Sequence, residues 1–259
     1  MFLRICHLYP DLMNIYGDRG NVIALQKRSQ WRGIETEVIQ ATVGRSYDFR
    51  QFDIVFFGGA QDKEQKLVCA DLQSASQELQ TRQGDSLRMA VEDGAVVLGI
   101  CGGYQLLGEY FRTGEGEVLP GLGIFDAYTV AGNRRMIGDV VVESPFFPGA
   151  PQKTLVGFEN HSGQTFLRNG LQPIGRAVIG NGNNGQDRFE GAVYKNAFGS
   201  YLHGSLLPKN PWFADLLIER ALERKYGDKV ELASLEDDLE ILAHDSASKR
   251  AATRPRLAT

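Results

Sequence analysis

Hydrophobic and polar residues alternate in blocks along the first half of the chain. Short apolar runs predict buried strands, and they lie at residues 2–8, 35–41, 53–57 and 95–100. Amphipathic stretches between them predict helices at residues 22–32, 62–82, 86–92 and 104–111. Asp18 is a candidate N-cap for the first of these helices, which Gly33 would end. Strands that alternate with helices predict an α/β fold, with a mostly parallel central sheet and helices on both faces.

The pattern changes after Gly114. Short strand-like runs follow between clusters of glycine, asparagine and proline, at residues 124–130, 136–143, 155–158, 176–179, 191–194 and 198–203. They predict additional antiparallel strands in the second half. An amphipathic helix over residues 211–226 begins at Pro211, a residue suited to the first helical turn. We expect one domain over residues 1–245 and a disordered tail over residues 246–259, which are small, polar and basic.

The composition is ordinary for a soluble globular protein, since 42% of the 259 residues are hydrophobic and 23% are charged. A net charge of −4 gives no electrostatic case for binding nucleic acid. No apolar run reaches the ~20 residues of a membrane span, and the first residues lack the layout of a signal peptide. Three cysteines at irregular spacing argue against disulfides and favour a reduced cytosolic compartment.

The segment G-I-C-G-G-Y-Q around Cys101 carries the main chemical signal. A strand that ends in a cysteine between glycines, with a helix directly after it, predicts a strained turn that presents a nucleophile. The helix N-terminus favours the thiolate form, because backbone N–H groups and the helix dipole stabilise negative charge. Cys6 and Cys69 fall within a predicted strand and a predicted helix, so we interpret both as core residues.

A thiol nucleophile needs a base, and four histidines are available. His203 follows an apolar strand, and catalytic groups of parallel sheets gather beyond the carboxyl ends of strands, so His203 is the favoured base. His161 is the second candidate, and its alternative is a loop histidine that bonds its own turn. His7 is interpreted as a strand-end residue and His244 as a solvated residue near the tail.

Hydrolysis through a thiol also needs donors for the oxyanion. The N–H group of Gly102, directly after the nucleophile, is the expected first donor. The second is expected from the turn Gly58-Gly59-Ala60, with Gly59 as the candidate, because glycine lets the backbone approach a substrate closely. The alternative for these glycines is a plain tight turn. No G-x-x-x-x-G-K-[ST] segment is present, so no phosphate-binding loop is predicted.

With the segments around Cys101 and His203 (S-Y-L-H-G) and the glycine turn at 58–59, the chain resembles the class I glutamine amidotransferases over residues 1–226. The resemblance implies their three-layer, flavodoxin-like fold. It also implies hydrolysis of L-glutamine to glutamate and ammonia, with cysteine as nucleophile and histidine as acid and base. Most members carry a glutamate two residues after the histidine, where this chain has Ser205.

The serine at that position, and the segment G-F-E-N-H-S-G at 157–163, resemble the cobyric acid synthase-like branch of the family. Residues 8–21 and 206–211 closely resemble the glutaminase subunits of lipid II isoglutaminyl synthases. That resemblance implies an ATP-using, Mur-ligase-like partner subunit, MurT. The partner would hold ATP and magnesium and use the ammonia to amidate the D-glutamate α-carboxyl of lipid II, giving D-isoglutamine. This chain would then need no cofactor or metal of its own, and would act in the cytoplasm at the inner face of the membrane.

Two more residues take roles from the resemblance. Arg135 is the candidate for binding the glutamine carboxylate, since a guanidinium binds a carboxylate in a bidentate way. Glu159 is a candidate to orient His203 in place of the absent glutamate. The segment at 8–21 is a candidate for partner contact or glutamine entry.

Three alternatives stay open from the sequence. A dienelactone hydrolase-like enzyme also uses a G-x-C-x-G elbow, but no convincing aspartate loop stands before His203. A non-enzymatic binding subunit of amidotransferase fold would not need Cys101 and His203. A cobyrinate-type amidotransferase is the nearest alternative within the family, although such enzymes usually carry their ATP domain on the same chain.

Overall fold

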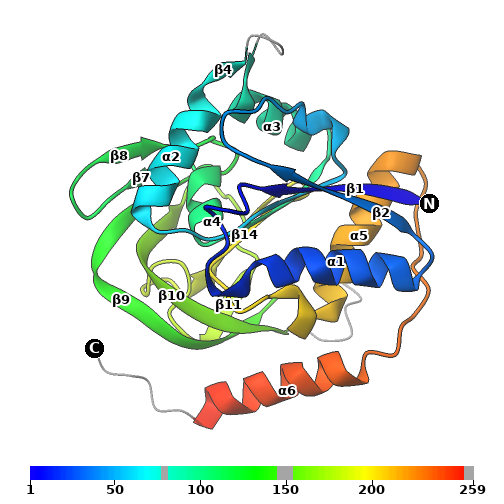
Figure 1. Ribbon diagram of the computed structural model, residues 1–259. Coiled ribbons are helices and arrows are strands. Elements are labelled where there is room, and N and C mark those ends of the chain that lie inside the picture. The colour runs from blue at the N-terminus through cyan, green and yellow to red at the C-terminus, as the bar shows by residue number, and fades with distance from the viewer. Residues whose placement is uncertain (77–80, 145–153, 254–259) are drawn as a thin grey trace.

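The computed structural model describes residues 1–76, 81–144 and 154–253. Among these residues, a first sheet has six strands in the order β13-β14-β6-β3-β1-β2 (Figure 1). The strands are β1 (Phe2–Leu8), β2 (Glu35–Ala41), β3 (Ile54–Phe57), β6 (Val96–Ile100), β13 (Ala192–Tyr194) and β14 (Ala197–Ser200). Neighbouring strands are parallel except for β13 and β14, so the predicted parallel core is confirmed.

Helices cover both faces of this sheet, as predicted (Figure 1). On one face lie α1 (Arg19–Trp31) and α5 (Pro211–Tyr226), which pack against each other. On the other lie α2 (Asp62–Gln73), α3 (Gln83–Glu92) and α4 (Gly102–Leu107). Short 3-10 turns form η1 (Ile15–Gly17), η2 (Phe49–Gln51) and η3 (Leu207–Lys209). The strands β3 and β6 are buried along their whole length, as expected for a sheet with two covered faces.

A second sheet follows in the second half of the chain. Its strands are β7 (Tyr110–Arg112), β8 (Val118–Pro120), β9 (Ala127–Glu143), β10 (Thr154–Leu167), β11 (Gly175–Ile179) and β12 (Phe189–Glu190). The pairing is antiparallel except between β7 and β9. The long ribbon β9–β10 contains a bulge between His161 and Gly163, and Phe158 of β10 pairs with His203 just beyond the end of β14. The ribbon thereby lies beside the carboxyl edge of the first sheet (Figure 1).

Two predicted helices are shorter than the pattern suggested. The helix predicted over 62–82 ends at Gln73, because the hydroxyl and N–H of Ser74 both donate to the carbonyl of Asp71 and close the last turn. The short strands β4 (Ala75–Ser76) and β5 (Thr81–Arg82) follow instead. The helix predicted over 104–111 begins at Gly102 and ends at Leu107, and β7 replaces its last turn.

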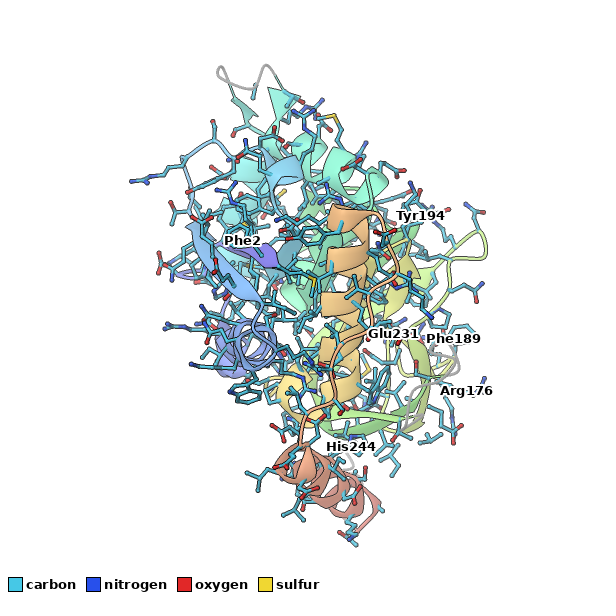
Figure 2. The ribbon with its side chains drawn as sticks, turned by 90° about the vertical axis from the view of Figure 1, so that its right-hand side faces the viewer. Phe2, Arg176, Phe189, Tyr194, Glu231 and His244 are labelled. Carbon is cyan, nitrogen blue, oxygen red and sulfur yellow. The ribbon has the colours of Figure 1, made fainter. Side chains whose placement is uncertain are left out.

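The predicted disordered tail is wrong for residues 246–253, since they belong to α6 (Asp238–Thr253). After α5 the chain runs back along that helix, past Glu231, and enters α6 (Figure 2). Ala247 and Ala251 of α6 pack against Val141 and Val156 of the β9–β10 ribbon, and this apolar contact orders the helix. Residues 254–259 lie outside the described part of the chain. None of the described helices is both long and apolar enough to cross a membrane.

Candidate active site

Cys101 lies in the turn between β6 and α4, at the carboxyl edge of the first sheet. Its backbone is held at φ 50° and ψ −104°, a conformation that costs energy for a residue with a side chain. The backbone N–H of Cys101 donates to the carbonyl of Ser200 at 2.8 Å, which ties the turn to the end of β14. Cys101 is therefore placed as a nucleophile elbow requires.

His203 lies just beyond β14 and is fully buried. Its backbone exchanges two hydrogen bonds with Phe158 of β10, with N···O distances of 2.7 and 3.3 Å, so the second sheet fixes the backbone of His203. Tyr16 of η1 covers the ring edge-on, with centroids 5.0 Å apart. The Nε2 atom has no hydrogen-bond partner among the described residues. Cys101 follows the neighbouring strand β6, and it contributes to raising the pKa of His203.

The carboxylate beside His203 comes from Asp18, and it was missed by the sequence reasoning. Asp18 is fully buried, and its Oδ1 lies 3.3 Å from Nδ1 of His203. Burial alone would lower the pKa of His203, but Cys101 and the Asp18 carboxylate together raise it to about 10. Both neighbours thus favour the charged imidazolium form of the ring.

Asp18 occupies the N-cap position of α1, but the predicted capping is wrong because its side chain accepts no capping hydrogen bond. Its Oδ2 instead accepts a hydrogen bond from the N–H of Gly59 at 2.8 Å. A β-carbon on Gly59 would lie 2.8 Å from Cε1 of His203 and 3.1 Å from Oδ2 of Asp18. Glycine is therefore required there for the carboxylate and the imidazole to meet.

The role predicted for Gly59 as an oxyanion donor is corrected by this contact, because its N–H already serves Asp18. The next residue, Ala60, lines the pocket in front of Cys101. Its backbone nitrogen lies 3.0 Å from the place of a β-carbon on Gly102, so the backbones of Ala60 and Gly102 face each other closely. A side chain on Gly102 would occupy this gap.

Glu159 does not orient His203, contrary to the expectation from sequence. Its carboxylate accepts hydrogen bonds from the backbone N–H groups of Asn181 and Gly182 and from the side-chain amide of Asn181. Glu159 therefore holds the turn after β11. An acid that lies beside His161, 3.9 Å from its Nε2, cannot serve His203 in the same way.

His161 bonds its own turn, which was the alternative to a catalytic role. Its Nδ1 lies 2.7 Å from the carbonyl oxygen of Gly163, and its ring stacks on Tyr201 with centroids 3.6 Å apart. His7 is the next-to-last residue of β1 and is buried, which agrees with its interpretation as a residue near the strand end. The solvated position predicted for His244 is wrong, because its side chain is 3% exposed and contacts the carbonyl of Lys209 and the hydroxyl of Thr154.

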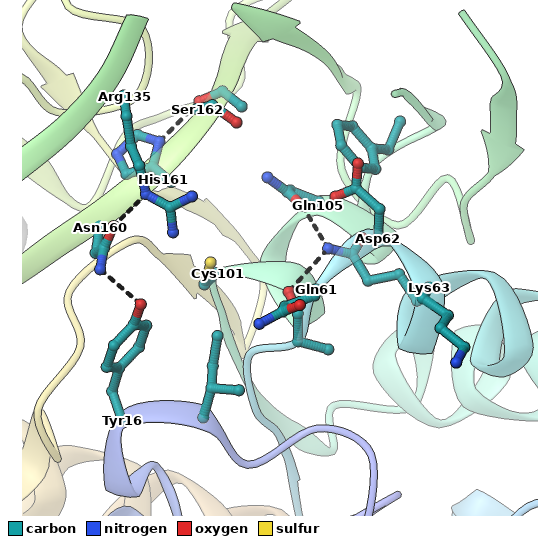
Figure 3. Close-up of a pocket in the computed structure, with 15 residues that line it drawn as sticks. Tyr16, Gln61, Asp62, Lys63, Cys101, Gln105, Arg135, Asn160, His161 and Ser162 are labelled. Carbon is teal, nitrogen blue, oxygen red and sulfur yellow. Dashed lines mark hydrogen bonds between the residues drawn. The ribbon is translucent and has the colours of Figure 1, made fainter. Parts of the chain in front are cut away.

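A pocket of about 690 Å³ opens in front of Cys101 (Figure 3). Arg135 of β9 points into it, and the Nε–H of Arg135 donates to Oδ1 of Asn160 at 2.6 Å. The amide of Asn160 in turn donates to the hydroxyl of Tyr16 at 2.6 Å. This chain of three side chains joins β9, β10 and the segment at 8–21, and it fixes the guanidinium at the pocket's rim. Tyr16 and Asn160 gave no signal of their own in the sequence.

Ser205 holds the segment at 8–21 against the histidine loop. Its hydroxyl donates to the carbonyl of Gly17 at 2.6 Å. A β-carbon on Gly20 would lie 2.1 Å from the hydroxyl oxygen of Ser205, so only glycine at position 20 lets the two loops approach each other. Ser205 therefore anchors the loop that supplies Asp18.

No group of three or more histidine, cysteine, aspartate and glutamate side chains within the described ranges is arranged to hold a metal ion. The chemistry of the site rests on sulfur, imidazole and carboxylate. Together they can move one proton between a thiol, a leaving group and a water molecule.

The chain is similar to known proteins over most of its length. A model of the CobB/CobQ-like glutamine amidotransferase domain matches residues 4–211. The chain is 40% identical to the subunit GatD of the glutamine-hydrolysing lipid II isoglutaminyl synthase of Streptococcus pneumoniae, over 92% of this chain and 87% of that protein. It is 41% identical to the corresponding subunit of Staphylococcus aureus, over 96% of each chain. A cobyric acid synthase from Pelotomaculum thermopropionicum is 35% identical over 48% of this chain and 26% of that protein.

Solved structures agree on the fold. The structure of PurLQS from Thermotoga maritima aligns with a TM-score of 0.56 at 18% identity, over 88% of this chain and all of that chain. The glutaminase domain of Trypanosoma brucei CTPS aligns with a TM-score of 0.53 at 12% identity, over 90% of this chain and 98% of that chain. These likenesses confirm the predicted three-layer α/β fold.

Proposed function

The chain belongs to the CobB/CobQ-like family of glutamine amidotransferases, and we propose that it is the glutaminase subunit of a lipid II isoglutaminyl synthase. Family membership makes it an enzyme that takes ammonia from glutamine. The observation that carries the proposal is that Cys101 and His203 follow neighbouring strands, with the buried Asp18 beside His203 and with Cys101 in a pocket that Arg135 also lines. Similarity to GatD subunits over more than nine-tenths of the chain supports lipid II synthase as the setting.

In the proposed reaction the sulfur of Cys101 attacks the side-chain amide carbon of L-glutamine. His203 takes the proton of the thiol, and the Asp18 carboxylate stabilises the resulting imidazolium. His203 gives this proton to the departing nitrogen, so ammonia leaves and a thioester on Cys101 remains. Water then attacks the thioester with His203 as base, which releases glutamate and restores the thiol.

The oxyanion of each tetrahedral step needs preorganised donors. We assign the N–H of Gly102, at the start of α4, as one donor, and the N–H of the pocket-lining Ala60 as the other. Gly59 then contributes by holding Asp18 and by leaving room for His203. Loss of one such donor typically raises the barrier by ~3–4 kcal/mol.

Arg135 is proposed to bind the α-carboxylate of glutamine. Its Nε–H is engaged by Asn160, which leaves the two terminal nitrogens of the guanidinium for a bidentate contact. Because Figure 3 places Arg135 above Cys101 in the same pocket, a substrate held there by its carboxylate can present its amide to the sulfur.

The ammonia is proposed to reach a Mur-ligase-like partner, the MurT subunit. ATP and magnesium would act on that partner, where the D-glutamate α-carboxyl of lipid II is activated and then amidated to D-isoglutamine. This chain would work in the cytoplasm, at the inner face of the membrane through the complex. Similarity supports this setting over a cobyrinate-type enzyme, since the match to the GatD subunits is 40% and 41% identical over 92% and 96% of this chain, whereas the match to a cobyric acid synthase is 35% identical over 48% of it.

The proposal is tested by reconstitution. The chain, co-purified with a Mur-ligase-like subunit, is expected to amidate lipid II only when both glutamine and ATP are present. Cys101→Ala is expected to abolish ammonia release from glutamine while free ammonia still supports amidation by the complex. 6-diazo-5-oxonorleucine is expected to label Cys101 in the active chain. Ammonia release that persists in the Cys101→Ala protein would refute the mechanism, and activity on cobyrinate but not on lipid II would refute the setting.

A further inference from the structure

The pocket in front of Cys101 carries opposite charges on two sides. Arg135 reaches in from β9, and Asp62 faces it from the first turn of α2, with Cys101 between them (Figure 3). The proposed function uses the guanidinium and the sulfur, but it assigns nothing to the carboxylate. Asp62 is exposed at the mouth of the pocket, so its carboxylate is open to a ligand that enters there.

Asp62 has no ion pair and no side-chain hydrogen bond among the described residues. Burial against the pocket wall and the nearby Glu115 raise the pKa of this carboxyl, and Arg135 across the pocket opposes that rise. The neighbouring acid of the same turn, Glu64, does not line the pocket. Asp62 is thus the acid of α2 that a bound molecule would meet.

A second acceptor lies on the same face of the helix. Gln65 follows Asp62 by three positions, lines the same pocket and is 2% exposed. Its amide nitrogen donates to the carbonyl of Ala60 and to Oε1 of Gln105, which fixes the amide's orientation. Its oxygen, Oε1, is buried without a partner among the described residues. The α2 side of the pocket therefore presents the acceptors of Asp62 and Gln65, and Lys63 of the same helix extends away from Cys101 (Figure 3). The β9 side presents the donors of Arg135.

We propose that Asp62 binds the α-ammonium group of the substrate, opposite Arg135 at the α-carboxylate. The two residues then recognise the zwitterion of an α-amino acid, and Gln65 adds polarity suited to a cation on the same side. This inference rests on the proposed glutaminase function and deepens it, because it explains how the pocket separates glutamine from amides that lack the amino group. A charged hydrogen bond of this kind corresponds to about 10- to 100-fold in affinity.

The test compares L-glutamine with glutaramate, which has the same amide and carboxylate but no amino group. Binding is measured by calorimetry in the full-length Cys101→Ala background, so that nothing is consumed and turnover is not required. The parent site is expected to bind glutamine at least about tenfold more tightly than glutaramate. Asp62→Asn is expected to weaken the binding of glutamine by about tenfold or more, while the affinity for glutaramate changes by no more than about twofold.

Glu64→Gln is the matched control, since it removes a nearby carboxylate that lies outside the pocket. It is expected to leave the affinity for both ligands unchanged. Asp62→Glu keeps the charge and is expected to retain part of the preference for glutamine. Equal weakening of both ligands by Asp62→Asn, or unchanged binding of glutamine, would overturn the proposal. Thermal unfolding of each variant reports whether the fold is intact. Failure of the glutaminase function itself is read separately, from ammonia release by the unmodified chain.

Discussion

The Oδ1 atom of Asp18 lies 3.3 Å from Nδ1 of His203, although 185 residues separate them in the chain, and both side chains are fully buried. A carboxylate in this position fixes the orientation of the imidazole and stabilises its charged form. The loop before α1 thus supplies a carboxylate to a histidine at the end of β14. Ser205, by anchoring Gly17, holds that loop in place.

Asp18→Asn is expected to lower kcat for ammonia release by about 100-fold or more, with a smaller effect on KM. The amide keeps the size of the side chain but removes the charge that helps raise the pKa of His203 to about 10. A histidine with a raised pKa keeps its proton up to higher pH and loses it as the pH rises through that value. The alkaline limb of kcat/KM is therefore expected to move to lower pH in Asp18→Asn.

The measurement is a pH profile of glutamine-dependent ammonia release. Asp11→Asn is the control, because Asp11 is an exposed acid of the same N-terminal segment. An alkaline limb that stays in place in Asp18→Asn, with kcat near that of the parent, would show that Asp18 does not act on His203.

Gly59→Ala is expected to abolish most of the glutaminase activity without unfolding the protein. The new methyl group would lie 2.8 Å from Cε1 of His203, too close for ordinary contact, so the imidazole must move away from Cys101. We expect a loss of about 100-fold in kcat, since misplaced catalytic groups lose much of their effect. Gly114→Ala is the control, because its β-carbon would meet only Ala131 at 4.0 Å. Circular dichroism and thermal unfolding report on the fold, and full activity in Gly59→Ala would contradict the packing described for the imidazole.

Arg135→Ala is expected to raise KM for glutamine by about tenfold or more with a smaller change in kcat. The guanidinium is fixed through Asn160, so Asn160→Ala is expected to raise KM in the same direction but less. Arg134→Ala removes the adjacent positive charge, which does not line the pocket, and serves as the control. Steady-state kinetics decide the matter. A KM that is unchanged in Arg135→Ala would remove this residue from the binding site.

Local patterns predicted the elements that are regular and continuous. The strand Phe2–Leu8 and the helix Pro211–Tyr226 have the predicted bounds, because an apolar run and a proline-started amphipathic stretch each decide their own conformation. The ribbon β9–β10 was predicted only as fragments, since polar and glycine residues interrupt its apolar pattern. Pairing across the ribbon keeps these interruptions within strands, and no single-strand pattern contains that information.

Some residues of the candidate site could likewise be predicted from local sequence signals, and others could not. The glycines around Cys101 and the strand before His203 are local signals, and they placed both residues at the same edge of the sheet. Asp18 carries a local signal that points elsewhere, because an aspartate before a helix is a common cap. Its partners, Gly59 and His203, are distant in sequence, so only the folded chain shows that its carboxylate turns inward.

Arg28→Ala is expected to lower the stability of the fold and to leave the catalytic activity of the folded protein unchanged. The guanidinium of Arg28 in α1 has a side-chain exposure of 3% and donates to both oxygens of Asp215 and of Asp237. Its removal leaves Asp237 unpaired, and Asp215 keeps only Arg32. Since breaking a buried ion pair is costly and these carboxylates are partly solvated, we expect the free energy of unfolding to fall by about 2–3 kcal/mol.

Arg50→Ala is the matched control, because Arg50 pairs with Asp48 but its side chain is 55% exposed, so no measurable change is expected. Arg28→Lys keeps the charge but not the forked geometry, and it is expected to fall between the parent and Arg28→Ala. Urea unfolding at neutral pH measures all three, with kcat recorded at a concentration where each is folded. Equal stability of the Arg28→Ala and Arg50→Ala proteins would show that the network joining α1, α5 and the segment before α6 adds nothing to the fold.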